Sequence, residues 1–377
     1  MAGLYIHIPF CASRCIYCGF YSTTRPDLQN KYVDALCKEL YLRKDYLHTT
    51  TDKDNDDIIR TIYIGGGTPS QLTLQNLERI IKHSFGTTKC MPEEITIEAN
   101  PEDITDDYAV GLKSIGANRI SMGVQTFDDD RLKFLNRRHN SNQVYRAIES
   151  ISKARINNIS IDLMFGFPQQ NIEEWEKDIN KAVALDVNHI SAYGLMYEEG
   201  TRLYNMREQN RIKEIDEELS IKMYDKLINS LTINGYEHYE ISNFARIGFR
   251  SRHNSSYWHD TPYMGIGAAA HSYNILSRQW NVSDINEYIK NIEMGVVPMT
   301  SEQIDEDTHF NDLITTALRT SDGINLSTLN ERYREHIIKN SGKYLSDGTA
   351  VLKDNIFKLT LNGIHISDMI MSDLMIV

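Results

Sequence analysis

The sequence predicts an α/β fold, in which a partial barrel of six strand–helix units is followed by a mainly helical C-terminal domain. Over the first half of the chain, short apolar runs alternate with segments of helical period, which is typical of a parallel sheet with crossover helices. Six units form an incomplete version of the eight-unit barrel, whose active sites lie at the carboxyl ends of the strands. Nearly every unusual motif of this chain follows directly after a predicted strand.

The six predicted strands are short runs rich in Ile, Leu, Val and Tyr. They cover residues 4–8, 58–64, 94–98, 119–124, 160–164 and 189–193. Between them, apolar residues recur at helical spacing, as where Tyr32, Leu36 and Leu40 fall near one face. The predicted helices cover residues 28–47, 74–85, 106–115, 143–154 and 172–185.

The strand–helix alternation stops after about residue 198. Residues 214–234 predict one amphipathic helix, and residues 236–280 are rich in Tyr, His, Asn and Gly. From about Thr300 the pattern predicts two helices and a hairpin over 350–361, with its turn at 353–355, which suggests a winged helix. We therefore divide the chain into a partial barrel (1–205), a connecting region (206–299) and a C-terminal helical or winged domain (300–377).

Charge argues against a nucleic-acid partner. The whole chain of 377 residues has a formal net charge of −12. Winged helices often bind DNA, but residues 300–377 hold twelve Asp or Glu and seven Lys or Arg, a net charge of −5. A surface that binds phosphate groups would need the opposite balance.

Composition also predicts the compartment. No N-terminal run resembles a signal peptide, and no run of ~18 apolar residues predicts a membrane span, so we expect a cytoplasmic protein. Three of the five cysteines are clustered, which in a reducing compartment indicates a metal or catalytic site. The other two, Cys37 in a helical pattern and Cys90 in a loop-like stretch, are expected to be structural.

Cys11, Cys15 and Cys18 follow the first predicted strand and are the main candidates for metal binding. Three thiolates so close together can hold three corners of an iron–sulfur cube, which leaves one iron open. The alternative is a zinc site completed by His7 or His48. Zinc sites usually pair cysteines in two Cys-x-x-Cys knuckles, and this chain lacks them.

Further candidates follow the later strands. Gly65-Gly66-Gly67-Thr68-Pro69 would let backbone groups approach a ligand closely, although an ordinary turn is the alternative. It is no Walker loop, because no Gly-Lys-Ser/Thr follows. The polar residues at strand ends are Glu98, Gln125 and Asp162, and Arg137 could bind a ligand carboxylate through two hydrogen bonds. Each could instead be a helix cap, a satisfied buried group or a solvated charge.

The spacing Cys11-x3-Cys15-x2-Cys18, with Tyr17 before the last cysteine, and the order of the strand-end motifs resemble the radical S-adenosylmethionine (SAM) superfamily. The resemblance implies a radical-SAM barrel with a 4Fe–4S cluster held by the three cysteines, and SAM bound to the open iron through its methionine end. In such proteins one electron cleaves a carbon–sulfur bond of SAM and releases a 5′-deoxyadenosyl radical.

The resemblance also implies a role for each site residue. Those expected to bind SAM are Tyr5 and Tyr17 near the cluster, Gly66, Gly67 and Thr68 at the amino group, Glu98 and Arg137 at the methionyl part, Gln125 at the ribose, Asp162 at the adenosine side, and Met196 through its backbone.

A segment in the connecting region separates two groups of this superfamily. His253-Asn254-Ser255-Ser256-Tyr257-Trp258 resembles the His-Asn-x-x-Tyr-Trp segment of HemW-type heme chaperones, in which the histidine is implicated in heme binding. His253 is therefore the expected heme ligand and His271 the next candidate; a histidine that merely holds a loop is the alternative. The later Gly265-x-Gly267-x-x-Ala270 imitates a dinucleotide fingerprint but lacks the strand and acidic residue that would confirm one.

Two features favour the chaperones over the similar oxygen-independent coproporphyrinogen III dehydrogenases (HemN-like). The dehydrogenases have a further cysteine where this chain has Phe20, and a longer segment before the cluster, where this chain has ten residues. Two positions depart from the chaperone pattern: Gly19, where an acidic residue is frequent, and Ala269, where glycine is common.

The sequence therefore predicts a heme chaperone that binds a 4Fe–4S cluster, SAM and heme, and transfers heme to apo-hemoproteins. Relatives suggest that these include respiratory membrane proteins, and that the chaperone forms a homodimer. The alternative is an enzyme of porphyrin biosynthesis that oxidatively decarboxylates coproporphyrinogen III to protoporphyrinogen IX. A third hypothesis is a protein that retains the cluster only as a structural element. The sequence leaves open whether the chain is an enzyme.

Overall fold

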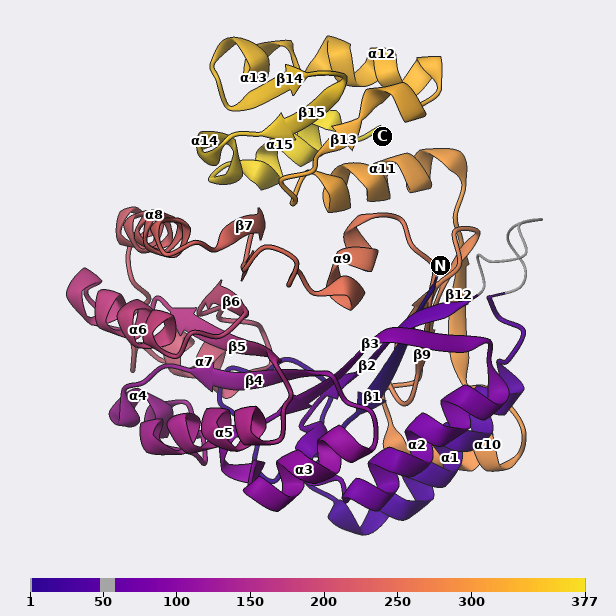
Figure 1. Ribbon diagram of the computed structural model, residues 1–377. Coiled ribbons are helices and arrows are strands. Elements are labelled where there is room, and N and C mark those ends of the chain that lie inside the picture. The colour runs from indigo at the N-terminus through magenta and orange to yellow at the C-terminus, as the bar shows by residue number, and fades with distance from the viewer. Residues whose placement is uncertain (1, 48–57, 377) are drawn as a thin grey trace.

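The computed structural model describes residues 2–47 and 58–376; His48, the second zinc-ligand candidate, lies outside them. A curved sheet of twelve strands forms its centre, in the order β12-β11-β10-β9-β1-β2-β3-β4-β5-β6-β8-β7. Helices cover its convex side, and a smaller C-terminal unit lies across its concave side (Figure 1). The predicted α/β class, a partial barrel with a C-terminal helical unit, is confirmed.

The six predicted strands form the parallel centre of the sheet, side by side in chain order. They are β1 (Ala2–Ile8), β2 (Ile59–Gly66), β3 (Cys90–Ala99), β4 (Arg119–Gln125), β5 (Asn158–Phe165) and β6 (His189–Gly194). The prediction of a loop around Cys90 was wrong, because Cys90 pairs with Ile59 and begins β3. A prediction based on apolar runs misses the start of this strand, because proline and polar residues interrupt the apolar run between Cys90 and Glu94.

Crossover helices join these strands on the convex side. They are α1 (Gln29–Leu42), α2 (Leu74–Thr87), α3 (Asp106–Ser114), α4 (Asp129–Phe134), α5 (Ser141–Lys153) and α6 (Ile172–Ala184), with short 3-10 turns at Pro26–Leu28, Pro69–Gln71 and Pro101–Asp103. Side chains of Thr73, Asn140 and Asn171 cap α2, α5 and α6, which stabilises each helix by about 1 kcal/mol. The first helix ends at Leu42, five residues before the predicted end.

The connecting region adds strands to both edges of the sheet. β8 (Asn243–Ala245) pairs antiparallel with β6 and with β7 (Glu237–Glu240), while β9 (Tyr263–Ile266) pairs parallel with β1. Beyond β9 follow β10 (His271–Tyr273), β11 (Ser277–Asn281) and β12 (Met299–Gln303), and the helices of this region are α7 (Arg202–Glu208), α8 (Glu217–Ile233), α9 (Arg252–Trp258) and α10 (Ile285–Glu293). These strands were not predicted, because they are short and owe their pairing to edges supplied by distant parts of the chain.

A buried carboxylate on α1 anchors the glycine segment after β9. Glu39 is fully buried and accepts hydrogen bonds from the backbone of Gly267 (2.8 Å), from Asn281 (2.7 Å) and from Tyr288 (2.5 Å). Gly267 has φ 102°, which favours glycine. The segment that imitates a dinucleotide fingerprint is therefore packed against α1.

The C-terminal unit has a hydrophobic cluster of its own, centred on Phe310, Ile314, Ile337 and Phe357. Its helices are α11 (Glu306–Ala317), α12 (Glu331–Asn340), α13 (Gly342–Ser346), α14 (Leu361–Ile364) and α15 (Ser367–Leu374), and a 3-10 turn covers Leu326–Thr328. Its small sheet comprises β13 (Ile324–Asn325), β14 (Ala350–Lys353) and β15 (Ile356–Leu359).

The predicted hairpin of this unit is present. Asp354 and Asn355 form its turn with φ of 53° and 63°, as a type I′ turn requires. None of the described helices is long and apolar enough to cross a membrane.

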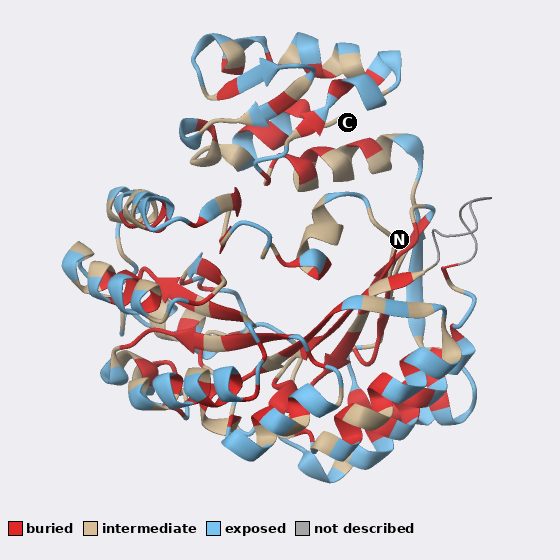
Figure 2. Cartoon of the chain, viewed as in Figure 1, coloured by how far each residue is buried: buried red, intermediate tan, exposed pale blue. Residues whose placement is uncertain are grey.

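The two faces of the central strands carry different chemistry. Leu4, Ile6 and Ile8 of β1 are fully buried among the residues of the main hydrophobic cluster, and Figure 2 shows buried residues concentrated along the strands and on the helix sides that face them. The alternate residues face the concave side, and they include Tyr5, paired with Tyr63. The concave face is therefore the place where polar and aromatic side chains gather.

Candidate functional site

The loop with the three cysteines leaves the carboxyl end of β1 and is fixed by backbone hydrogen bonds. Cys11 donates to Thr23 (2.9 Å), Ile16 donates to Leu135 (3.1 Å), and Cys18 donates to Cys15 (3.4 Å). All three thiols are free and partly exposed. The loop thus presents its sulfur atoms at the edge of the sheet where barrel sites lie.

Two side chains from other parts of the barrel reach these sulfur atoms, one from the segment after β2 and one from the segment after α4. The Thr68 hydroxyl donates to Cys11 Sγ over 3.5 Å, and Arg137 Nη1 donates to Cys15 Sγ over 3.6 Å. Burial raises the pKa values of the Cys11 and Cys18 thiols, and neighbouring cysteines raise them further. A positive metal centre would offset this cost by favouring the thiolates.

His7 is not available as the fourth ligand of a zinc ion. Within residues 2–47 and 58–376, no three His, Cys, Asp or Glu side chains converge to hold a single metal ion. His7, one zinc-ligand candidate, is buried and has both ring nitrogens in hydrogen bonds, to Tyr5 Oη (2.9 Å) and the Tyr21 carbonyl oxygen (3.1 Å). Three separated thiolates of one loop can instead hold separate irons of a cube.

The glycine segment brings β2 against the cysteine loop. Gly67 donates its N–H to the Ile8 carbonyl oxygen (2.8 Å), and a Cβ at this position would lie 3.0 Å from Cys11 Sγ. Gly66 has φ 113°, and a Cβ there would lie 2.5 Å from the His7 ring. Both positions therefore need glycine for close approach.

Glu98 lies beside this segment with both carboxylate oxygens in use. Oε1 accepts from the Tyr63 hydroxyl (2.7 Å), and Oε2 accepts from the Gly66 N–H (3.0 Å). Burial raises the pKa of Glu98 to about 7; the Tyr63 hydrogen bond lowers it, and Asp162 raises it. Glu98 is thus poised to change its ionisation near neutral pH.

Arg137 connects the cysteine loop with the ends of β3 and β4. Its Nη2 donates to Asn100 Oδ1 (2.7 Å) and to the Gly123 carbonyl oxygen (2.6 Å), while its buried Nε has no partner among the described residues. Burial disfavours its charge, but Tyr17 and Cys15 raise the pKa of Arg137 above its ordinary value. The alternative of a solvated surface charge does not describe this side chain.

The other predicted SAM residues lie at neighbouring strand ends. Gln125 ends β4 with φ 69°, and Gly123 pairs with Asp162 of β5. Burial raises the pKa of Asp162 to about 6, against the lowering effect of Arg119. Burial likewise raises the pKa of Tyr17. Met196, after β6, has a side chain that is 60% exposed.

Arg119 was missed by the sequence analysis. It is only 1% exposed, and its Nε and Nη1 have no hydrogen-bond partner in the described part of the chain. It pairs with Thr96, whose buried hydroxyl is also without a partner. The available signal was a lone arginine two residues before Ser121 in an alternating strand, which places its side chain on the concave face.

His253 lies on the concave side of the sheet on α9, against the starts of β1–β3. Its Nδ1 is 2.9 Å from Thr61 Oγ1 and its Nε2 is 2.8 Å from Tyr257 Oη. Its ring stacks on Tyr63 at 5.1 Å, and its backbone N–H donates to Glu94. Burial lowers the pKa of His253 to about 3, so the ring is neutral.

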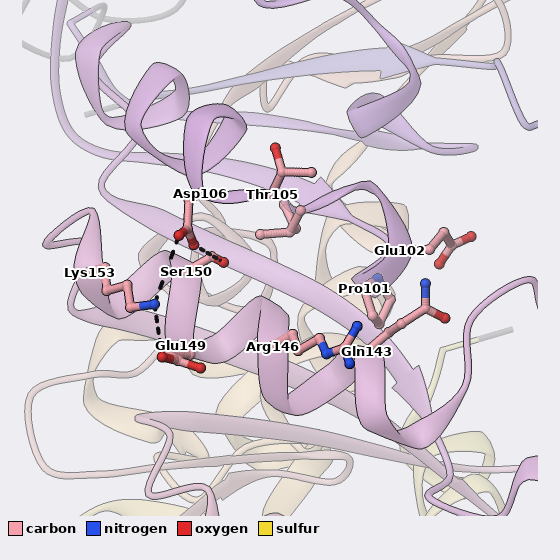
Figure 3. A pocket seen from close by; sticks show the side chains of 10 residues that line it. Pro101, Glu102, Thr105, Asp106, Gln143, Arg146, Glu149, Ser150 and Lys153 are labelled. Atoms are coloured by element: carbon pink, nitrogen blue, oxygen red, sulfur yellow. Dashed lines mark hydrogen bonds and ion pairs between the residues drawn. The ribbon is translucent and has the colours of Figure 1, made fainter.

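Figure 3 shows a cavity that lies elsewhere. It measures 380 Å³ on the convex side, between the residues before α3 and helix α5. Four of its polar side chains pair with one another, since Asp106 accepts a hydrogen bond from Ser150 (2.5 Å) and Lys153 lies 2.8 Å from Glu149. It includes none of the predicted site residues and is a surface depression outside the barrel.

Comparisons with known proteins agree with this geometry. The profile of the Radical SAM superfamily matches residues 5–182. The heme chaperone HemW of Bacillus subtilis is 35% identical over 88% of this chain and 87% of its own length, and that of Lactococcus lactis is 37% identical over 76% and 73%.

A solved structure shares the fold. Coproporphyrinogen III oxidase (HemN) from Escherichia coli superposes with a TM-score of 0.83 at 20% identity, over 99% of this chain and 89% of its own. The twelve-stranded sheet and the C-terminal unit are both included in that match. Taken with the sequence relatives, these findings show that the chain belongs to the radical SAM superfamily and, within it, to the family of HemW heme chaperones.

Proposed function

We propose that this protein is a heme chaperone that carries a 4Fe–4S cluster on Cys11, Cys15 and Cys18 and binds SAM beside it. The observation that carries the proposal is the contact of two polar side chains with the cysteine sulfurs, Thr68 with Cys11 and Arg137 with Cys15. Similarity to the HemW chaperones supports heme as the cargo. When bound, the cluster would supply an open iron and an electron to SAM.

The chain's own groups suit the methionyl end of SAM. The Arg137 guanidinium, whose Nε has no partner among the described residues, would bind the carboxylate. The Glu98 carboxylate would accept from the amino group, which the backbone at Gly66, Gly67 and Thr68 would also contact. We assign Gln125 to the ribose, Asp162 and the backbone of Met196 to the adenosine side, and Tyr5 and Tyr17 to the walls near the cluster.

The remaining parts of the proposal rest on family similarity. They are a homodimer and delivery of heme to apo-hemoproteins, including respiratory membrane proteins. The proposed cytoplasmic location rests on composition, and the division at residues 205 and 299 rests on the pattern of predicted strands and helices. The acidic C-terminal unit offers no argument for a nucleic-acid partner.

Anaerobic reconstitution tests the cofactor assignment. We expect about four irons per chain and a 4Fe–4S absorption spectrum that changes when SAM is added. The triple variant Cys11→Ala/Cys15→Ala/Cys18→Ala should lose the iron, whereas Cys37→Ala/Cys90→Ala should keep it, since those thiols lie on α1 and at the start of β3. Iron retained by the triple variant would disprove the cluster site.

Product analysis separates the chaperone from the dehydrogenase. Reconstituted protein with SAM, a reductant and coproporphyrinogen III should leave the substrate unchanged, and ferric heme should form a saturable complex with the same preparation. Formation of protoporphyrinogen IX with consumption of SAM would overturn the chaperone in favour of the dehydrogenase. If the protein neither bound heme nor converted coproporphyrinogen III, the third hypothesis would remain, in which the cluster is only a structural element.

A further inference from the structure

The two histidines considered for heme have very different surroundings. Both ring nitrogens of His253 are engaged, by Thr61 and Tyr257, and the residue is 1% exposed. Tyr63 covers one face of its ring, and Tyr257 meets it edge-on at 5.2 Å. To bind iron, His253 would have to give up a buried hydrogen bond and displace the tyrosine that makes it, which leaves a buried polar group unpaired.

His271 is exposed, whereas His253 is buried. His271 begins β10, and its ring takes no hydrogen bond from any residue that the structure describes. Its ring stacks on the indole of Trp280, with the centroids 6.1 Å apart and the planes inclined by 25°. Partial burial and then Arg278 lower the pKa of His271, so the imidazole is neutral at neutral pH, the form that binds metals.

The backbone places His271 on the concave face, next to the proposed SAM site. Gly265 pairs with Tyr5, so a side chain at position 265 would project on the face of Tyr5. A Cβ there would collide with the carbonyl oxygen of His271, which occupies that space. His271 is also near enough to His7 to add to the lowering of its pKa, which burial brings to about 4.

On this face of β10 and β11, Arg278 and Tyr273 contact other parts of the chain, whereas His271 is exposed. Arg278 and Tyr273 are held by the C-terminal unit and the loop before β9: Arg278 lies 3.3 Å from Asp312 of α11, and Tyr273 donates to Asp260. His271 pairs with Trp280, and Tyr273 pairs with Arg278 two residues further along β10. An exposed imidazole backed by an indole, with no hydrogen-bond partner among the described residues, therefore lies on β10, separated by β9 from the strand that carries Tyr5.

We propose that His271 is the residue that binds the heme iron, with Trp280 alongside the imidazole, and that His253 has a structural role. The inference rests on the proposed function, since heme must bind for a ligand to be assigned. Imidazole is a common axial ligand of heme iron, and aromatic rings such as the Trp280 indole pack well against the face of a porphyrin.

Titration of the full-length protein with ferric heme tests the assignment. Wild type should give a saturable complex with the absorption of histidine-ligated heme. His271→Ala should bind at least tenfold more weakly with an altered Soret band, and added imidazole should restore the band. His271→Gln provides a second variant of similar size. The matched control is His83→Ala, an exposed histidine on the far side of α2, which should behave as wild type.

His253→Ala separates the two assignments. We expect it to lower the midpoint of urea unfolding, because it removes buried bonds, while the folded protein keeps the wild-type Soret band. A His271→Ala protein that binds heme like wild type would overturn the inference, whether or not His253→Ala then loses heme. Absence of saturable binding to folded wild type would instead overturn the proposed function, and the inference with it.

Discussion

Arg137 lies with one guanidinium nitrogen 3.6 Å from the sulfur of Cys15 and the other 2.6 Å from the Gly123 carbonyl oxygen. The cysteine loop after β1 is thereby tied to the end of β4 by a single side chain. A Cβ on Gly123 would lie 3.0 Å from Arg137 Nη2, so the strand leaves just enough room for the guanidinium. Cluster loop and strand ends are thus positioned together.

Arg137→Gln should weaken SAM binding by about 10- to 100-fold, which corresponds to losing a hydrogen bond between charged groups worth about 1.5–3 kcal/mol. Calorimetric titration of reconstituted protein measures the affinity. Arg137→Lys should not restore it, because an ammonium lacks the planar fork. Arg138→Gln is the matched control: Arg138 is 3.7 Å from Glu102 but does not reach a cysteine, and its variant should bind SAM normally.

SAM binding should tighten as pH rises from 6 to 8. The pKa of Glu98 is raised to about 7, so the carboxyl is mostly protonated at pH 6 and ionised at pH 8. The amino group of SAM would donate a stronger hydrogen bond to the ionised carboxylate than to the protonated one. Glu98→Gln should bind more weakly at pH 8 and show little change with pH. A wild-type affinity that stays flat over this range would contradict the assignment of Glu98.

The stability of the protein without ligand provides an independent check on Glu98. Its folded-state pKa lies above the unfolded value of 4.5, so the native state holds a proton that the unfolded chain releases. The free energy of unfolding should therefore fall between pH 4.5 and 7 and stay lower above 7, by at most about 3 kcal/mol. Glu98→Gln should be more stable than wild type at pH 8 and similar at pH 4.5 by urea denaturation.

Arg119 should affect the pH dependence of SAM binding, because it lowers the pKa values of nearby carboxylates. Its buried charge lowers the pKa values of Asp162 and, more weakly, of Glu98. Arg119→Gln should move the midpoint of the pH dependence of SAM binding upward, and Arg119→Lys should move it less. A purely structural role would change stability and leave that midpoint where it is. Unfolding midpoints measured on the same preparations separate the two outcomes.

The parallel core was predictable because it depends on local patterns. Alternation of apolar runs and helical periods marks each strand–helix unit, and Glu98, Gln125 and Asp162 were found because polar residues break those patterns at strand ends. Strands β7 to β12 carry no such local mark. β10 has three residues and β12 is exposed throughout, and they form because edges of the sheet are already in place.

Burial and pairing of side chains were beyond the sequence. Arg119 and Arg137 are both arginines next to apolar segments, yet Arg119 is buried, and Arg137 is partly buried and donates to the Gly123 carbonyl oxygen. Likewise, nothing in the His253–Trp258 motif indicated that Tyr257 would engage the histidine. The burial of Arg119 depends on how distant strands meet, which periodicity does not encode. The contact between His253 and Tyr257 needs only α9, on which the two residues lie four positions apart.

Gly19 shows how a departure from a family pattern can be compensated in space. A Cβ at this position would collide with a carboxylate oxygen of Glu198, from the loop after β6. An acidic group is therefore present beside the cysteine loop, although residue 19 has no side chain. Gly19→Asp would place two carboxylates together, and we expect it to lower the free energy of unfolding by about 1 kcal/mol and to reduce cluster content. Gly19→Asn, of equal size but uncharged, should cost less, and Gly19→Asp/Glu198→Gln should regain most of the loss. If the double variant were as unstable as Gly19→Asp, steric crowding and not charge would explain the glycine.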